Sequence, residues 1–529
     1  MESKKLRVIP LTAASIEIIS SERAIYVDKT EQIYGLLQDK TSSQYFLARP
    51  RRFGKSLLVD VIKQLFLGKK TFFKETWIYN SDWSWVSRSV LHFDMSKVPC
   101  DSPEALSAQL IIVVQKMAQE YGIDFLNFNN SPGVALELII DKLSKDKKVV
   151  ILVDEYDYAI VSNIENPELA LKMREILKSF YTVLKSCSAS LEFVFITGVS
   201  KFSQTSLHSG MNQLIDLTLD PRAASLVGYT EAEVDKYFSE YIEKNAGQLN
   251  LSVNDLREKI KEWYNGYRFS NLDVKVYNPF SLNRFLYDGE FINHWFSSGN
   301  PSFLFKLMKE QDIDIRQIEN KALEREMLLS FDVRQIDIEV LLYQTGYLTI
   351  VDYDPELGEF TLNFPNKEVR DSFYRHFIYS YTGKVEASAS ITRFIARNIK
   401  IGFVQNDLQK VMDGFYELFL SINYDLHIPL EKFYQTIFFV TLRILGFDIK
   451  TEVKTNIRRI DAVVESLDRI FIIEFKINKS AKEALAQIET QKYYDKFLNQ
   501  GKEVVIVGVS FNTEQRNIDK ESWVCKVVH

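Results

Sequence analysis

The stretch that decides the fold of the C-terminal region is Asp461-Ala462-Val463-Val464, together with Ile472-Ile473-Glu474-Phe475-Lys476. The polar turn Ser466-Leu467-Asp468 separates the two apolar runs, a pattern that predicts a β-hairpin. Successive side chains on a strand alternate between its two faces, so Glu474 and Lys476 point the same way. The hairpin therefore brings the carboxylates of Asp461 and Glu474 close to the ammonium group of Lys476.

Two carboxylates and one ammonium group are the parts of a metal-dependent hydrolase site. The carboxylates hold a hard divalent cation, Mg²⁺ or Mn²⁺, and the lysine orients or helps to deprotonate the attacking water. The same Glu-x-Lys pattern on an edge strand also occurs as a solvated face or as a cross-strand ion pair. The elements around the hairpin favour the first interpretation.

Six elements are predicted around the hairpin from hydrophobic periodicity. They are a helix at 433–445, strands at 449–453, 460–464 and 470–476, a helix at 482–497 and a strand at 504–509. The order αβββαβ, with the carboxylates on the second and third strands, resembles the core of the PD-(D/E)XK nuclease superfamily. The resemblance implies a restriction-endonuclease-like domain.

The resemblance extends to single residues. Asp461 matches the Asp of the superfamily, and Glu474-Phe475-Lys476 matches its (D/E)-x-K. Gln487, on the following helix, matches a glutamine often found there. The implied catalytic residues are therefore Asp461, Glu474, Lys476 and Gln487, of which Asp461 and Glu474 bind the metal. Glu431 and Glu452 are candidates for a further carboxylate.

A phosphate-binding loop is predicted near the other end of the chain. The apolar run 45–48 leads into Arg49-Pro50-Arg51-Arg52-Phe53-Gly54-Lys55-Ser56 and then into a helical pattern at 57–66. In a P-loop the backbone cradles phosphate, Lys55 reaches the β- and γ-phosphates, and the Ser56 hydroxyl binds Mg²⁺. ATP would thus contact Arg51, Arg52, Phe53, Gly54, Lys55 and Ser56. The standard motif opens with glycine where this chain has Arg49, and the three arginines are expected to compensate by charge.

Two further apolar strands end in polar residues. The run 148–153 ends at Asp154 and Glu155, the Walker B arrangement, in which Asp154 holds Mg²⁺ and Glu155 polarises the attacking water. The alternative is an aspartate that caps a helix after an ordinary parallel strand. Thr197 follows the run 193–196 and stands where a γ-phosphate sensor would, or is simply the end of a strand.

These segments resemble the AAA-ATPase-like domain that is fused to a PD-(D/E)XK nuclease domain in bacterial proteins. The unusual loop with Arg49 belongs to that pattern, whereas Arg458 stands where the family usually has glycine. The other matching blocks are Tyr26-Val27-Asp28-Lys29-Thr30, Asp154-Glu155-Tyr156-Asp157, Thr197-Gly198-Val199-Ser200-Lys201, Tyr264-Asn265-Gly266-Tyr267-Arg268-Phe269 and Val276-Tyr277-Asn278-Pro279-Phe280-Ser281.

The composition sets bounds on the class of protein. A hydrophobic content of 46% in 529 residues indicates several globular domains. The three scattered cysteines suit a reducing cytoplasm, and no signal peptide, membrane-spanning run or histidine cluster is evident. The net charge of −6 is unevenly spread, because the part from Leu430 onward is the less acidic. Its basic residues Lys450, Lys454, Arg458 and Arg459 either grip a nucleic-acid backbone or form a solvated face.

The predicted fold is α/β, with four domains. These are a P-loop domain with a parallel sheet (1–221), a helical lid (222–330), a winged-helix-like module with a helical connector (331–429) and the nuclease-like domain (430–529). The helix and hairpin of the third domain fit a winged helix and equally a lid subdomain without DNA contact. Arg222, just past the last strand of the P-loop domain, either serves as an arginine finger or caps the edge of the sheet.

The architecture predicts a nuclease in which ATP binding and hydrolysis gate phosphodiester cleavage. The cofactors are ATP and Mg²⁺ or Mn²⁺, and the partner is nucleic acid, DNA in preference to RNA, without a membrane. A homo-oligomer and a role in bacterial defence or DNA processing are further expectations from architecture alone. The alternative is a regulatory or scaffolding ATPase whose C-terminal domain binds nucleic acid or a partner without cutting.

Overall fold

The computed structural model describes residues 6–12, 15–39, 41–124, 131–201, 213–295, 302–329, 332–382, 389–422, 431–454, 459–518 and 522–528. The chain divides into two compact units. The N-terminal unit comprises Met1–Gly299 and Glu319–Val369, and the C-terminal unit comprises Asn300–Ile318 and Arg370–His529. Both units combine helices with a five-stranded sheet, which confirms the predicted α/β class.

The N-terminal unit is built on a parallel sheet with the strand order β2-β3-β4-β1-β5. Residues of β1 and β3 are buried throughout, as expected for strands covered by helices on both faces. Strand β4 lies between β1 and β3, and all three are parallel, so the loops after these strands open on the same edge of the sheet. The strands are β1 (Gln44–Ala48), β2 (Ser89–Asp94), β3 (Val149–Asp154), β4 (Leu191–Gly198) and β5 (Ile215–Asp216).

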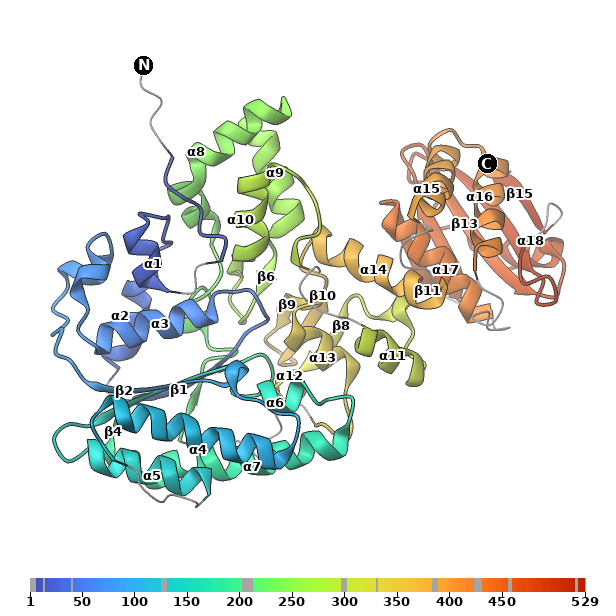
Figure 1. Cartoon of the computed structure of the whole chain (residues 1–529). Helices are drawn as coiled ribbons and strands as arrows, with labels where there is room; N and C mark the ends of the chain where they lie inside the picture. Colours follow the sequence, from blue (N-terminus) through green and yellow to red (C-terminus); the bar gives the residue numbers. More distant parts are fainter. Residues whose placement is uncertain are drawn as a thin grey trace. The chain divides into compact units, whose positions relative to one another are not determined.

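Helices cover both faces of this sheet. In Figure 1, α2 and α3 lie on one face, and α4, α5 and α7 lie on the other. Serine and asparagine side chains cap two of the long helices, since Ser102 accepts from the Ala105 amide and Asn166 accepts from the Leu169 amide. The helices are α1 (Ile16–Ser21), α2 (Thr30–Leu37), α3 (Lys55–Phe66), α4 (Pro103–Glu120), α5 (Pro132–Leu143), α6 (Tyr158–Val161) and α7 (Pro167–Ser186).

A second helical layer follows the sheet in the sequence. Thr230 and Glu233 form a capping box at the start of α8, which fixes where that helix begins. Its core includes Phe238, Tyr264 and Phe285, and the N-terminal residues Ile25 and Val27 pack into the same cluster. The elements are α8 (Glu231–Leu249), α9 (Val253–Tyr264), α10 (Pro279–Asp288) and the short antiparallel strands β6 (Tyr267–Arg268) and β7 (Lys275–Val276).

The last part of the N-terminal unit is a small antiparallel sheet with the order β8-β10-β9. The predicted helix and the hairpin around Pro355 are confirmed as α13, β9 and β10. Strand β8 was expected to be helical, and it forms a strand because it pairs with β10 from a distant part of the chain. The elements are β8 (Lys321–Glu324), α12 (Arg325–Leu328), α13 (Ile338–Thr345), β9 (Thr349–Asp354) and β10 (Glu359–Asn363).

The C-terminal unit contains a second five-stranded sheet, with the order β11-β12-β13-β14-β15. The β13–β14 pair is parallel, and the other pairs are antiparallel. The predicted order αβββαβ is confirmed, and β15 is an additional edge strand. The elements are α17 (Glu431–Ile444), β11 (Asp448–Lys454), β12 (Arg459–Glu465), β13 (Arg469–Ile477), α18 (Ala481–Thr490), β14 (Glu503–Phe511) and β15 (Trp523–Val528).

The predicted helix at 482–497 is shorter in the structure, because α18 ends at Thr490. Lys492 has a φ of 49°, a left-handed conformation that a right-handed helix cannot contain. The turn places Tyr493 in the core cluster with Ile488, so tertiary packing ends the helix early. The other helices of this unit are α11 (Ser302–Glu310), α15 (Ala389–Val404) and α16 (Leu408–Leu420). Helix α14 (Lys367–Thr382) begins in the N-terminal unit and continues into this one.

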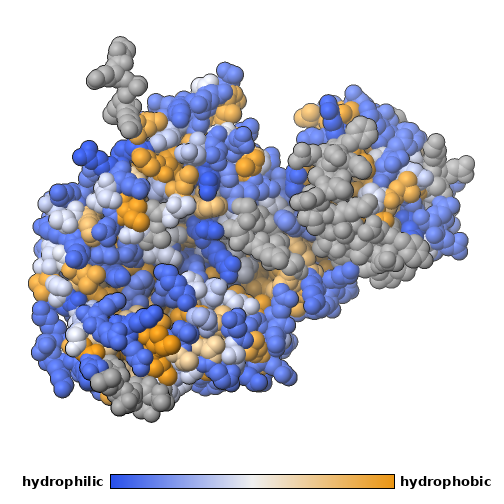
Figure 2. Space-filling view, in the orientation of Figure 1, coloured by the Kyte–Doolittle hydropathy of each residue, from blue (hydrophilic) through white to orange (hydrophobic). Residues whose placement is uncertain are grey.

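On the face shown in Figure 2, hydrophobic residues are scattered among hydrophilic ones. Among the described residues, no helix is both long enough and apolar enough to cross a membrane.

Glu368, near the start of α14, is a carboxyl group buried inside the N-terminal unit. Its side chain is about 1% exposed and accepts a hydrogen bond of 2.8 Å from the Trp295 amide. Burial raises the pKa of Glu368 to about 7, and hydrogen bonding to the amide only partly opposes this. The folded protein therefore keeps a proton on Glu368 at a pH where the unfolded chain has lost it.

Glu368→Gln is expected to stabilise the N-terminal unit at pH 8 and to have little effect near pH 4.5. The folded pKa is raised, so wild-type stability falls as pH rises from about 4.5 to about 7, by up to about 3 kcal/mol. Glutamine removes this penalty because it never ionises. Calorimetry at pH 5 and pH 8 measures the difference, with the exposed Glu356→Gln as control. An equal effect of Glu368→Gln at both pH values would contradict the prediction.

Candidate active sites

The phosphate-binding loop connects β1 to α3, as the sequence predicts. Gly54 has a φ of 92°, which glycine adopts without strain, and α3 begins at Lys55 directly after it. Arg52 also has a positive φ, of 70°, so the turn places a non-glycine residue in a less favourable conformation. The buried ring of Phe53 packs edge-on against Tyr267 and Phe269, with ring centroids at 4.7 and 5.2 Å. These aromatic contacts hold the loop against β6.

Lys55 is buried, and its ammonium group is turned back into the loop. Its Nζ donates to the carbonyl oxygens of Arg49 and Pro50, both at 2.9 Å. Burial lowers the pKa of Lys55, and the negative charges of Asp154 and Glu155 oppose this effect. The arrangement keeps a cation at the N-terminus of α3, where a phosphate would lie.

Arg49 is a structural residue of the loop. Its guanidinium group donates to the carbonyl oxygens of Ala48, Thr218 and Ala223 at 2.7–2.9 Å, and it lies 4.4 Å from the centre of the Phe269 ring. Because its charge is satisfied by backbone carbonyls, Arg49 does not supply the phosphate compensation expected of all three arginines. Arg51 and Arg52 do line the cavity beside the loop.

The Walker B residues lie at the end of β3, next to the end of β4. Thr197 Oγ1 donates to Asp154 Oδ1 at 2.6 Å, so these two predicted site residues are in direct contact. Glu155 follows with a φ of 54° and lines the cavity, and burial raises the pKa of its carboxyl group. Asp154 and Thr197 are buried, and neither is among the residues that line the cavity.

Asp157 has a role that the sequence did not reveal. Its buried carboxylate accepts hydrogen bonds from the amides of Val199 and Ser200 and from the Ser200 hydroxyl, at 2.7–3.3 Å. It therefore ties the turn after β3 to the turn after β4. The motif 154–157 contains three acidic residues, and the sequence does not indicate which of them has a structural role.

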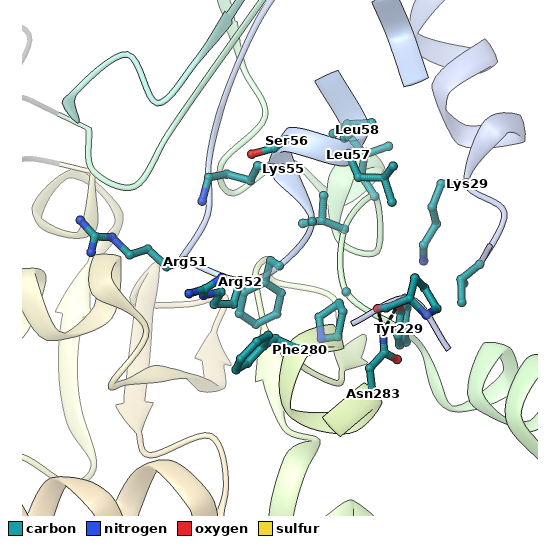
Figure 3. Close-up of a pocket in the computed structure, with 18 of the residues that line it drawn as sticks. Lys29, Arg51, Arg52, Lys55, Ser56, Leu57, Leu58, Tyr229, Phe280 and Asn283 are labelled. Atoms are coloured by element: carbon teal, nitrogen blue, oxygen red, sulfur yellow. Dashed lines mark hydrogen bonds between the residues drawn. The ribbon is translucent and has the colours of Figure 1, made fainter. Parts of the chain in front are cut away.

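A cavity of about 750 Å³ lies beside the P-loop, a volume within the usual range for a small-molecule site. Figure 3 shows Lys55 and Ser56 on one side of it, Arg52 and Phe280 near the middle, and Asn283 with Tyr229 on the opposite side. Lys29 also lines it and is held by Glu233 at 2.7 Å. The cavity joins the predicted ATP residues 51–56 to residues of α10 that sequence reasoning had not included.

Arg222 lies outside this cavity. Its guanidinium group pairs with Asp220 at 2.7 Å and with Asp39 at 3.0 Å, beside the edge strand β5. Within this chain the arrangement corresponds to the edge-capping alternative.

The second site lies on the hairpin of β12 and β13. The two strands pair antiparallel, with Ala462 opposite Ile473. Asp461 Oδ2 accepts from the Phe475 amide at 2.8 Å, which fixes the aspartate beside Glu474. Lys476 Nζ donates to Glu474 Oε1 at 3.1 Å, and Gln487 Nε2 donates to the same oxygen. The structure therefore brings together all four residues predicted for this site.

Successive side chains of β13 point to opposite faces of the sheet, and this alternation positions Glu474. Phe475 points into an aromatic cluster, with its ring 5.1 Å from Phe438 of α17 and 5.5 Å from Phe511 of β14. Glu474 consequently points to the opposite face, where α18 supplies Gln487.

Glu474 is poorly solvated for a charged residue. Its side chain is 3% exposed, and burial followed by repulsion from Asp461 raises its pKa to about 7, against the opposing charge of Lys476. Among the described residues, Glu474 Oε2 has no hydrogen-bond partner. A buried carboxylate oxygen without a donor, next to a second carboxylate, fits a divalent cation.

Of the two candidates for a further carboxylate, Glu431 and Glu452, only Glu431 has a described side chain. Glu431, at the start of α17, has a pKa raised by burial and opposed by the charge of Lys476, and it accepts from Gln435 at 2.9 Å. The side chain of Glu452 lies outside the described residues. Within the described part of the chain, no three His, Cys, Asp or Glu residues are grouped as a metal site, so water and substrate oxygens would complete the coordination of a cation held by Asp461 and Glu474.

Of the four basic residues that precede Asp461, only Lys450 has a described side chain. Lys450 pairs with Asp448 at 3.8 Å. Arg458 and the side chains of Lys454 and Arg459 lie outside the described residues.

Gly508 allows α18 to approach the sheet closely. It lies opposite Glu474 in the β13–β14 pair. A Cβ atom at this position would lie 2.2 Å from the Ala481 carbonyl oxygen and 2.7 Å from the Leu485 amide nitrogen. Since both are backbone atoms, the helix that carries Gln487 would have to move.

Gly508→Ala is therefore expected to destabilise the C-terminal unit by about 1–3 kcal/mol, as overpacking usually does. The displaced helix would also carry Gln487 away from Glu474. Differential scanning calorimetry measures the loss, with Gly247→Ala as the matched control, because a Cβ atom at Gly247 meets nothing within 4 Å. A Gly508→Ala protein as stable as wild type would show that α18 can shift without loss of stability.

Fold and site geometry define an AAA-ATPase-like unit with a P-loop cavity and a restriction-endonuclease-like unit with an Asp–Glu–Lys site. Two family models match the chain, a predicted AAA-ATPase over residues 10–208 and the PD-(D/E)XK nuclease superfamily over residues 430–521. An uncharacterized protein in the vnfD 5'region of Azotobacter chroococcum mcd 1 is 32% identical over 528 residues, covering 98% of each chain. The chain belongs to the family in which a predicted AAA-ATPase domain and a PD-(D/E)XK nuclease superfamily domain are combined.

Proposed function

We propose that the protein is a metal-dependent nuclease in which ATP binding and hydrolysis gate the cleavage of DNA. The observation that carries the proposal is the complete set of Asp461, Glu474 and Lys476 around an unpartnered, buried carboxylate oxygen. A domain that had lost the activity would be under no pressure to retain all three groups in contact.

In the proposed nuclease site, Asp461 and Glu474 hold Mg²⁺ or Mn²⁺, which would polarise a phosphodiester oxygen or activate a water. Lys476 lies within hydrogen-bond distance of Glu474 and positions the attacking water. Gln487 donates to Glu474 Oε1, and among the described residues the other oxygen, Oε2, has no hydrogen-bond partner.

In the proposed ATPase site, Lys55 and the loop backbone bind the phosphates, and Ser56 and Asp154 hold Mg²⁺. Glu155 lines the cavity and orients the water that attacks the γ-phosphate. Thr197 contacts Asp154, which allows the end of β4 to respond to the occupancy of the site.

We also propose the domain limits 1–221, 222–330, 331–429 and 430–529, a cytoplasmic location and assembly into a homo-oligomer. These rest on the sequence pattern and on the family resemblance.

Cleavage assays test the proposal. Plasmid, linear DNA and RNA are incubated with Mg²⁺ or Mn²⁺ and with ATP, a non-hydrolysable analogue or no nucleotide. We expect DNA cleavage that needs the metal and changes with nucleotide. Equal cleavage with and without nucleotide would refute the gating. ATP hydrolysis without cleavage of any substrate would instead support the regulatory ATPase.

A further inference from the structure

The segment Asn300–Ile318 belongs to the C-terminal unit, although the chain on both sides of it belongs to the N-terminal unit. Its short 3₁₀ helix, Ile315–Gln317, packs against α17. Arg316 Nη1 donates to Gln435 Oε1 of α17 at 2.5 Å, and the Arg316 side chain is only 5% exposed. A residue far from the nuclease-like region in sequence is therefore part of the packing around α17.

The guanidinium group of Arg316 fixes the orientation of the Gln435 amide. A guanidinium group only donates hydrogen bonds, so it must face the amide oxygen of Gln435 and not the NH₂ group. The NH₂ group is thereby directed along α17, where Nε2 donates to Glu431 Oε1 at 2.9 Å. Asp314 accepts two further hydrogen bonds from Arg316, at 2.7 and 2.9 Å, which keep the guanidinium group in place. Gln435 is therefore held as a donor to Glu431.

Glu431 lies at the end of the sheet that carries Lys476. Three residues further along α17, the Tyr434 ring stacks on Phe511, with ring centroids 4.6 Å apart. Phe511 lies opposite Ile477, the residue that follows Lys476 on β13. Burial raises the pKa of Glu431, and the positive charge of Lys476 is the largest influence that opposes this rise. The start of α17 therefore places a carboxylate near the lysine of the nuclease site.

We propose that Gln435, oriented by Arg316, is a positioning residue of the nuclease site that holds the Glu431 carboxylate in place. Lys476 is then held between the carboxylates of Glu431 and Glu474, so its ammonium group has a defined position toward the attacking water. The inference rests on the proposed nuclease function. It adds to that site a residue from outside the segment that matches the nuclease superfamily.

Gln435→Glu tests the assignment in the full-length protein at pH 8. The new carboxylate still accepts from Arg316, so the packing of the segment 300–318 is kept, but an ionised carboxylate cannot donate to Glu431. Single-turnover cleavage of plasmid DNA at saturating DNA and Mg²⁺ is expected to slow by at least about tenfold, as loss of a positioning contact does. The DNA concentration at half-maximal rate should change by less than about twofold, because Gln435 does not touch the substrate.

Two sets of variants serve as controls. Gln409→Glu makes the same chemical change on α16, where Gln409 donates to the exposed Asp413 at 2.9 Å with the same four-residue spacing, and it should cleave at the wild-type rate. Arg316→Met should slow cleavage as well. Its loss should not add to that of Gln435→Met in the double variant, because Arg316 acts through Gln435.

Calorimetry on the same preparations separates positioning from folding. We expect the melting temperature of Gln435→Glu to stay at the wild-type value while cleavage slows. Wild-type cleavage by Gln435→Glu, slow cleavage only in proportion to a lowered melting temperature, or independent losses in the Arg316→Met and Gln435→Met pair would overturn the assignment and leave the nuclease site intact. Gln435→Met replaces Gln435→Glu if the latter does not fold. Absence of cleavage by wild type would overturn both this assignment and the proposed nuclease function.

Discussion

Glu474→Gln is expected to reduce DNA cleavage by at least about 1000-fold while ATP hydrolysis continues. Glutamine has the shape of glutamate and can still accept from Lys476, but it lacks the negative charge that holds the cation. Loss of a charge that binds the catalytic metal removes most of the rate enhancement of such a site. The measurement is the initial rate of plasmid nicking at saturating Mg²⁺ beside the rate of phosphate release from ATP.

Unfolding is not expected to explain the loss. Glu474 is 3% exposed and its pKa is raised mainly by burial, so a neutral side chain should be accommodated at no cost in stability. Lys476→Met should reduce cleavage as well, by loss of the ammonium group that positions water. Glu489→Gln is the matched control, because Glu489 lies on α18 and pairs with the exposed Lys526. Cleavage by Glu474→Gln at the wild-type rate would exclude this site.

The parts of this site that the sequence predicted are those encoded locally. The polar turn after Val464 sets the pairing of the hairpin, and the period of two places Glu474 and Lys476 on one face. The placement of Gln487 on a helix that returns across this face came only through the family resemblance.

Features that depend on distant contacts were missed or misjudged. Arg49 is one of the three arginines expected to compensate by charge, but its carbonyl partners Thr218 and Ala223, about 170 residues further along the chain, engage its guanidinium group. Strand β8 was expected to be helical, since its pairing with β10 is not visible in its own sequence. Arg316 gave no signal for the same reason, because Gln435 is 119 residues away. Propensity is a weak guide wherever tertiary packing decides.

Lys55→Ala is expected to reduce the rate of ATP hydrolysis by at least about 100-fold. It should also remove the dependence of DNA cleavage on ATP. Lys55 is the buried cation at the N-terminus of α3, and its Nζ donates to the loop carbonyls of Arg49 and Pro50. Electrostatic stabilisation of the transferred phosphoryl group is the main contribution a P-loop makes, so loss of this charge is severe. Phosphate release and nucleotide affinity are measured on the same preparation.

A comparison with Glu155→Gln shows which event licenses cleavage. Glu155 lines the cavity, so its replacement should block hydrolysis while Lys55 remains available to bind the phosphates. If ATP binding alone activates cleavage, Glu155→Gln should cut DNA continuously in the presence of ATP. Lys55→Ala should then show no response to ATP. If hydrolysis is required, both variants lose ATP-stimulated cleavage. Cleavage by both variants that follows ATP as in wild type would show that the P-loop cavity does not control the nuclease site.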